Sequence, residues 1–312
     1  MPNETPNFWQ KLREEAIASI SELDLPSDLQ IPSLPLAFTR FMEASQHPDV
    51  DIRDLGKIIE HDPGLTIELL KCVNVASFGV ENLAKTPTEA ILRLGIPTAR
   101  YFVLTAGMKT STLSFDLRLM NHHNFWTESI QRALFAQGVA ESISTNKDLA
   151  FMGGLLQDFM LPLLTNMYDS DYLDFLNSTD GISLYDWEEQ NFGWNHAAVG
   201  AYVAHQWRLP DELICNIFFH HKMELPLSAP NEEIFELFPA TVVAFLPDQL
   251  GQVPGGIERL LVADKRSDKF DLAAIAEIVD QKLDSFCDNT ERSNSLSAAF
   301  DAASRLQESA TA

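Results

Sequence analysis

Helix boundaries recur at short intervals along this sequence, and they constrain its fold more than any other feature. Asp62-Pro63 places a capping carboxylate before a proline at the first helical position. Thr86, Pro87 and Glu89 form a second start, in which Thr86 and Glu89 have the spacing of a capping box. Apolar residues recur at helical spacing between such signals, and no run of alternating β-branched residues is long enough to predict a sheet. The sequence therefore predicts an all-α protein.

The expected helices divide into two lobes. In the first lobe they cover residues 8–22, 35–42, 51–60, 63–76, 86–95 and 97–108, and in the second 125–143, 149–157, 161–176, 196–207, 210–221, 231–246 and 270–286. The polar stretch Asn121-His122-His123-Asn124 is expected to be a loop between them. The predicted division is an N-terminal lobe at 1–115, a second helical lobe at 116–290 and a weakly structured tail at 291–312.

Composition narrows the range of partners and compartments. The chain has 45 acidic and 22 basic residues and a net charge of −23, which argues against binding to nucleic acid or to an anionic membrane surface. Its three cysteines are far apart, and neither a signal peptide nor an apolar run of membrane-spanning length is present. We therefore expect a protein of the cytoplasm, with no disulfide framework and no thiolate zinc site.

Several polar groups in the second lobe are placed where they could converge. Gln157-Asp158 ends an apolar stretch, His196 begins an apolar helix, and His220-His221 end another. A carboxylate and imidazoles from different helices can hold a metal in the core of a helical bundle. His205 lies nine positions after His196, on the opposite face of the same helix, and is not expected to be a co-ligand.

The order of these motifs resembles the HDOD family, the HD-related output domains of bacterial signalling proteins. The resemblance covers roughly residues 25–225. Its most specific block is DIRDLGKIIEHDPGLTIELLKCVNVASFG, which ends at Phe78-Gly79. Later pieces are TPTEAILRLG, Phe125-Trp126, GLLQD, EQNFGWNHAAVGAYVAHQW, Leu209-Pro210 and the His220-His221 pair. The resemblance implies that the second lobe is an HD-domain-like helical bundle.

HD-type phosphohydrolases hold metal with a His, a His-Asp pair and a further Asp, and two-metal members add histidines. In this sequence the first His position reads Glu128 and the His of the pair reads Gln157, while Asp158 matches. His196 and His220-His221 match the later histidines. Because a neutral amide oxygen is a much poorer ligand than imidazole for a borderline metal, the resemblance implies a degraded site.

Three states of this site remain open at the sequence level. Asp158 could form a metal-free polar network with His196 or His220, while Glu128 pairs with Arg132 four residues later. In the second state, Glu128, Asp158, His196 and His220 hold a divalent metal (Mn, Fe, Zn or Mg) that does not catalyse a reaction. In the third state, the chain is a divergent phosphohydrolase in which Glu128 is one of the metal ligands. The metal-free network is favoured.

The functional expectation follows from this site. We expect a non-catalytic regulatory module of bacterial signal transduction that binds partner signalling proteins or a small ligand. The alternatives are a divergent metal-dependent phosphohydrolase and a nucleotide-binding sensor without turnover. No receiver, cyclase-like or kinase segment is recognisable, so the chain is expected to act by association with separate proteins.

Overall fold

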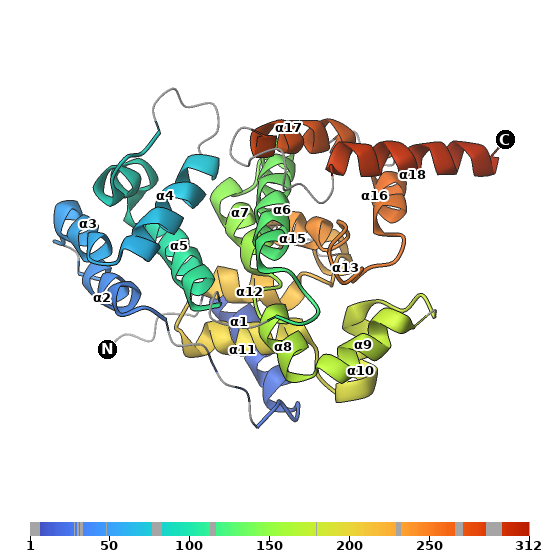
Figure 1. The fold of residues 1–312 in the computed structure, drawn as a ribbon, viewed down its shortest axis with the longest axis horizontal. Helices are drawn as coiled ribbons and strands as arrows, with labels where there is room; N and C mark the ends of the chain where they lie inside the picture. The colour runs from blue at the N-terminus through green and yellow to red at the C-terminus, as the bar shows by residue number, and fades with distance from the viewer. Residues whose placement is uncertain are drawn as a thin grey trace. The chain divides into compact units, whose positions relative to one another are not determined.

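The computed structural model describes residues 7–27, 29, 31, 34–47, 49–76, 83–112, 117–178, 180–228, 232–265, 271–284 and 295–311 (Figure 1). These residues form α-helices joined by turns and contain no β-strand, which confirms the predicted all-α class. Ser77, Phe78-Gly79 and Cys287 lie outside the described residues. Among the helices that are described, none is long and apolar enough to cross a membrane.

The chain divides into two compact units, residues 30–116 and residues 1–29 with 117–312. The smaller unit contains α2 (Leu36–Ser45), α3 (Ile52–Glu60), α4 (Pro63–Ala76) and α5 (Pro87–Thr112). The larger unit contains α1 (Phe8–Ser21), α6 (His122–Ile143), α7 (Lys147–Leu156), α8 (Leu161–Met167), α9 (Asp169–Asn177), α10 (Leu184–Phe192), α11 (His196–Gln206), α12 (Asp211–Phe219), α13 (Glu224–Ser228), α14 (Glu232–Phe235), α15 (Phe238–Val243), α16 (Gly256–Asp264), α17 (Leu272–Asp284) and α18 (Leu296–Thr311).

Local signals in the smaller unit act as the sequence predicts. The side chain of Asp51 caps α3, and that of Asp62 accepts a hydrogen bond from the backbone of Leu65 in the first turn of α4. Gly95 adopts φ 74°, a left-handed value that breaks α5 into two helical segments before Pro97. The predicted end at Gly95 and restart at Pro97 are thus present as a kink within one element.

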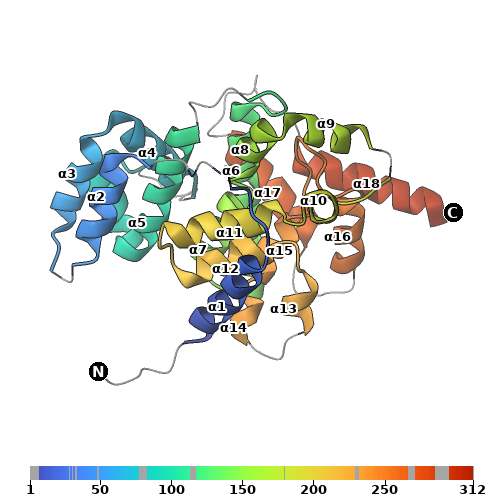
Figure 2. The same cartoon turned by 90° about the horizontal axis from the view of Figure 1, so that it is seen from below.

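The first helix belongs to the larger unit, although its place in the sequence predicts that it is part of the N-terminal lobe. Leu12 of α1 lies in one buried cluster with Cys215, Ile234 and Leu237. Both views of the ribbon place α1 against α11 and α12 (Figures 1 and 2). Burying the apolar face of a short helix against distant helices can override its position in the chain, and sequence patterns do not report such partners.

Two further expectations are corrected by the structure. His122 and His123 are the first residues of α6 rather than loop residues, because the side chain of Asn121 caps that helix by accepting from Asn124 N. The segment 291–312, expected to be weakly structured as either a weak helix or a disordered tail, contains the helix α18. Phe300 in this helix is 1% exposed and stacks on Phe135 of α6, so burial of an aromatic ring stabilises the segment.

Candidate functional site

Helix ends in the larger unit carry the predicted polar residues to one buried place. Asp158 lies in the turn after α7, and His196 is the first residue of α11, where Asn195 caps the helix by accepting from Ala198 N. His220 is the C-cap residue of α12. The ends of three separate helices thus bring these side chains to one point in the core of the larger unit.

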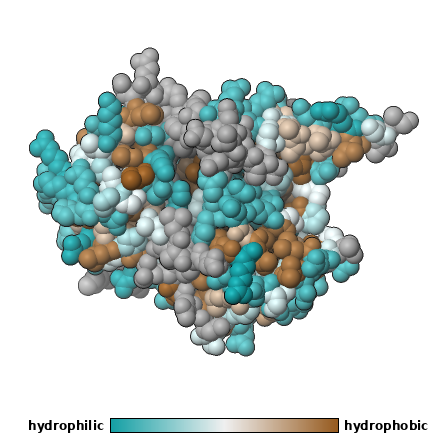
Figure 3. Space-filling model, in the orientation of Figure 1, coloured by the Kyte–Doolittle hydropathy of each residue, from teal (hydrophilic) through white to brown (hydrophobic). Residues whose placement is uncertain are grey.

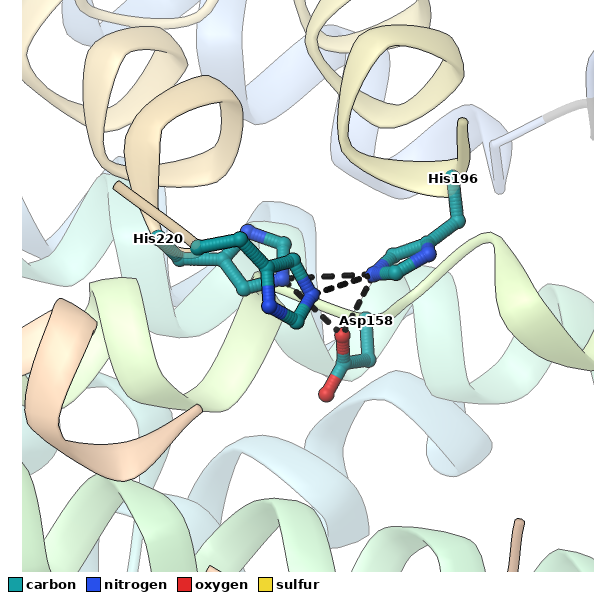
Figure 4. Close-up of side chains that lie close together, drawn as sticks. Asp158, His196 and His220 are labelled. Atoms are coloured by element: carbon teal, nitrogen blue, oxygen red, sulfur yellow. Dashed lines mark hydrogen bonds and ion pairs between the residues drawn. The ribbon is translucent and has the colours of Figure 1, made fainter. Parts of the chain in front are cut away.

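The carboxylate and two imidazoles form a near-equilateral triangle (Figure 4). Asp158 Oδ1 lies 3.4 Å from Nε2 of His196 and 3.3 Å from Nε2 of His220. The two Nε2 atoms are themselves 3.3 Å apart. The side chains of both histidines are 0% exposed and that of Asp158 is 3% exposed, so the triangle is shielded from bulk water.

The far side of each imidazole is held by an acceptor. Nδ1 of His196 lies 2.6 Å from Glu188 Oε2, and Nδ1 of His220 lies 2.7 Å from the carbonyl oxygen of Ile217. Because a carboxylate and a carbonyl oxygen can only accept, Nδ1 carries the proton in both rings. In the neutral rings, therefore, both Nε2 lone pairs point into the triangle, which is the orientation that metal-ligating histidines adopt.

His221 adds a fourth group. Its Nε2 lies 3.0 Å from Nε2 of His196, and its ring packs against Tyr185. Asp158, His196, His220 and His221 offer ligand atoms that all lie within 4.8 Å of one another. Burial and the neighbouring histidine charges hold the pKa of His221 well below its usual value, so this ring is neutral.

Charge is distributed unevenly within the cluster. Burial lowers the pKa of His196, but the carboxylates of Glu188 and Asp158 outweigh that effect and raise the pKa to about 10. Burial alone would raise the pKa of Asp158, yet Arg132 and the two histidines hold it well below the ordinary range. Without a metal, His196 is therefore an imidazolium facing an ionised Asp158, and a metal would have to displace its proton.

Arg132 of α6 places a fixed positive charge on the other side of Asp158. Its Nη1 lies 3.3 Å from Asp158 Oδ2, and its Nη2 lies 3.1 Å from Asp248 Oδ2. The guanidinium is buried and lies between two buried carboxylates. It is not primarily the partner of Glu128 that the sequence spacing suggested, although the two charges still interact.

Gln157 and Glu128, the two positions that depart from the HD pattern, differ in their relation to the cluster: Gln157 contacts Asp158, and Glu128 does not join it. Gln157 is buried beside Asp158, and its Nε2 donates to Asp158 Oδ2 at 3.3 Å, as does Nε2 of Gln252 at 3.2 Å. Glu128 accepts from the backbone of Gln249 and does not join the metal-capable group of the described residues. Burial raises the pKa of Glu128 to about 7.

The donor set fits a single divalent metal. A tetrahedral ion bound at the ~2.0 Å of a zinc–imidazole bond would separate its ligand atoms by about 3.3 Å, close to the spacing of the Asp158, His196 and His220 atoms. Asp158 Oδ1 is buried, and its polar neighbours are the Nε2 atoms of His196 and His220. Once His196 has given up its Nε2 proton, this carboxylate oxygen and the two Nε2 lone pairs would be well suited to a cation.

Sequence patterns identified the groups of the triangle but not the residues that hold them. Asp158, His196, His220 and His221 come together as predicted, whereas His205 does not join them. The sequence patterns do not point to Glu188, Asp248 or Gln252, nor to Tyr172, whose hydroxyl donates to Glu188 Oε1, and they favour Arg132 only as a partner of Glu128. The side chains of Tyr172, Glu188, Asp248 and Gln252 are all buried, and a sequence alone does not show which polar residue of a segment is buried.

Comparison with known proteins identifies the class. The family model for the HDOD domain matches residues 31–223, and the chain belongs to this family. An uncharacterized protein of Treponema pallidum (strain Nichols) is 26% identical over 197 residues, which are 62% of this chain and 38% of that protein. The chain therefore matches well under half of the length of this curated relative.

Solved structures with the same fold are similar over most of their length. An HDOD domain protein with unknown function from Geobacter sulfurreducens is 21% identical, with a TM-score of 0.57 over 94% of this chain and 98% of that chain. The protein named "Putative phosphohydrolase" from Shewanella amazonensis SB2B is 21% identical, with a TM-score of 0.60 over 87% and 97%. The protein named "Putative signal transduction protein" from Marinobacter aquaeolei VT8 is 16% identical, with a TM-score of 0.53 over 96% and 67%.

Proposed function

We propose that this chain is a non-catalytic regulatory HDOD module that acts by binding other proteins. The observation that carries the proposal is the buried guanidinium of Arg132 between Asp158 and Asp248. A two-metal phosphohydrolase needs a second divalent cation beside the carboxylate that bridges to the first. Here an arginine, which stays charged at all physiological pH values, holds that side of Asp158 and cannot activate a water molecule.

Burial of the remaining donors supports the same conclusion. Catalytic metal centres keep one coordination position open to water or substrate. The side chains of His196, His220, Asp158 and Arg132 are between 0% and 4% exposed. Gln157 and Gln252 also donate to the oxygen of Asp158 that faces Arg132. A phosphorylated substrate would have to displace this packed polar layer before it reached the triangle.

The test is a turnover assay on the full chain. Purified protein is incubated with Mn, Fe, Zn or Mg and with phosphomonoesters, nucleotides and cyclic dinucleotides. We expect no hydrolysis above that of Asp158→Ala. His205→Ala is the matched control, because His205 lies on the same helix as His196 but outside the cluster. Metal-dependent hydrolysis that Asp158→Ala abolishes and His205→Ala retains would overturn the proposal.

A divergent metal-dependent phosphohydrolase is the second candidate, and the triangle of donor atoms favours it. Asp158, His196, His220 and His221 would hold the metal, which when bound would supply a Lewis acid and a more acidic water. Glu188 and the Ile217 carbonyl would orient two of the rings. This candidate carries over to this chain the activity in the name of the Shewanella protein, "Putative phosphohydrolase".

Elemental analysis separates metal binding from catalysis. The chain is incubated with Mn, Fe or Zn, freed of loose ions and measured beside His220→Ala. One equivalent of metal that His220→Ala loses, without turnover, would mean a structural ion in a regulatory module. Protein that retains no metal in any of these incubations would eliminate the phosphohydrolase candidate.

A further inference from the structure

An open groove lies in the smaller unit, between the first turn of α2, the end of α3 and the turn into α4. Its volume is about 320 Å³, and it is lined by Leu36, Ala37, Arg40, Lys57, Ile58, His61 and Asp62. Leu36 is 63% exposed and the side chain of Lys57 is 66% exposed. At the left of Figure 3, where α2 to α5 lie in Figure 1, small apolar patches are surrounded by hydrophilic residues.

The groove gathers cationic side chains around an apolar floor. Arg40 forms no ion pair with the described residues, and Lys57 pairs only with Asp54 in an exposed contact of 2.8 Å. Such an exposed pair contributes little and leaves the lysine available to a second anion. The ring of His61 is fixed by its Nδ1, which lies 2.5 Å from the carbonyl oxygen of Lys57.

Backbone groups of α2 add to the positive potential. Pro35 precedes the helix, no side chain caps it, and no acidic residue lies in its first turn. The first backbone N–H groups of a helix lack intrahelical acceptors and attract negative charge. The acid in the groove, Asp62, already uses Oδ1 to accept from Leu65 N at the start of α4.

The distribution of charge in the whole chain sets this groove apart. Residues 30–116 contain eight Lys and Arg and ten Asp and Glu, a net charge of −2. The rest of the chain contains 14 basic and 35 acidic residues, a net charge of −21. An acidic partner would be repelled by most of the chain, and the near-neutral unit with its cationic groove is where it meets least repulsion.

We propose that this groove binds an acidic segment of a partner protein, with an aliphatic side chain on Leu36 and Ile58 and carboxylates on Arg40 and Lys57. A free phosphate would meet the cations but would leave Leu36 uncovered. Small-molecule sites bury most of their ligand, whereas this groove is open along one side, as peptide-binding grooves are. The proposal rests on the proposed function, since it names the partner chemistry of a binding module.

The test uses the full chain and three labelled synthetic peptides. The first alternates Asp and Glu around a central Leu, the second replaces that Leu by Ser, and the third replaces the acids by Gln. Fluorescence anisotropy measures binding at low and at physiological salt, and inorganic phosphate is added as a competitor. We expect saturable binding of the first peptide, weaker binding of the other two, and weaker binding at higher salt.

Matched variants locate the binding. Arg40→Glu with Lys57→Glu is compared with Arg53→Glu with Lys71→Glu, which changes the charge of the same unit equally; Lys57 and Lys71 have similar exposure and similar (i, i+3) partners. Leu36→Ser is compared with Leu92→Ser, since these leucines are 63% and 62% exposed. We expect the groove variants to weaken binding by about tenfold or more and the control variants to change it by about twofold or less.

Several outcomes would overturn the inference. Binding that falls equally in the groove and control variants would indicate general charge attraction. Phosphate competition without any contribution from Leu36 would indicate a simple anion site. Absence of saturable peptide binding in a chain that also shows no turnover would remove the groove and leave the regulatory assignment in place. Turnover together with groove-dependent peptide binding would remove the non-catalytic assignment and leave the peptide-binding groove in place.

Discussion

Glu188 holds His196 through both its backbone and its ring. Oε2 of Glu188 accepts from His196 N at 2.8 Å and from His196 Nδ1 at 2.6 Å, and its other oxygen accepts from the hydroxyl of Tyr172 at 2.6 Å. Glu188 and the His196 side chain are fully buried, and burial together with Glu188 raises the pKa of the Tyr172 phenol. The position of this imidazole is therefore fixed from the side opposite Asp158, while Glu188 and Asp158 together raise its pKa.

Replacing Glu188 by Gln is expected to lower the pKa of His196 from its value of about 10, because the carboxylate that favours the imidazolium is removed. Metal affinity should fall roughly 10- to 100-fold, as for other residues that orient a ligating histidine. Nitrogen-detected NMR titration measures the pKa, and competition with a chelator measures the affinity. Tyr172→Phe keeps both contacts to His196 and should have a smaller effect. Equal effects of the two variants would contradict the role given to Glu188.

Arg132→Met should be strongly destabilising. The substitution leaves Asp158 and Asp248 buried without their shared cation, and breaking a buried ion pair from one side costs about 3–5 kcal/mol. Urea denaturation of wild type and variant gives the loss in the free energy of unfolding. Arg132→Met combined with Asp248→Asn should recover part of it, because one of the two unpaired charges is removed. No recovery in the double variant would argue against this account.

The smaller unit shows how much of the fold local signals predict. Asp51, Asp62 and Gly95 mark helix boundaries that the structure reproduces, because capping and left-handed backbone depend on neighbouring residues only. The placement of α1 and the order of α18 depend instead on burial against distant helices. No local pattern carries that information, and both expectations differed from the structure.

The candidate site divides along the same line. Asp158, His196 and His220 stand out because each is polar at the end of an apolar helix. Arg132 and Glu188, by contrast, lie within helices. Arg132 is four positions after Glu128, the partner that the sequence predicts, and Glu188 is eight positions before His196, the partner that it has in the structure. Helical spacing favours Glu128 as the partner of Arg132. In the buried core the guanidinium is desolvated, and it is stabilised mainly by the carboxylates of Asp158 and Asp248.

Stability should depend on pH through Glu128. Burial raises the pKa of this carboxyl to about 7, so the folded state favours the protonated form. Its contribution to stability is full below the unfolded value of 4.5 and is lost as pH rises through about 7. Relative to Glu128→Gln, the wild type should therefore lose up to roughly 3 kcal/mol over this interval. Thermal unfolding of both proteins between these pH values measures the difference, and parallel curves would contradict it.

Gly154→Ala tests how closely α7 must approach α6 beneath the site. A Cβ at Gly154 would lie 2.9 Å from the backbone carbonyl oxygen of Arg132, so the helix carrying that arginine would have to move. At Gly138 a Cβ would lie 2.8 Å from the side chain of Ile275, which can rotate away.

Both substitutions gain up to about 1 kcal/mol of helix propensity, so that term cancels in their comparison. We expect Gly154→Ala to lower the free energy of unfolding by roughly 1–3 kcal/mol, and Gly138→Ala to change it by less. Urea denaturation provides both values. Equal losses would mean that backbone contact at Gly154 does not set the spacing of the two helices, and the ion pair of Arg132 with Asp158 would then owe its geometry to other contacts.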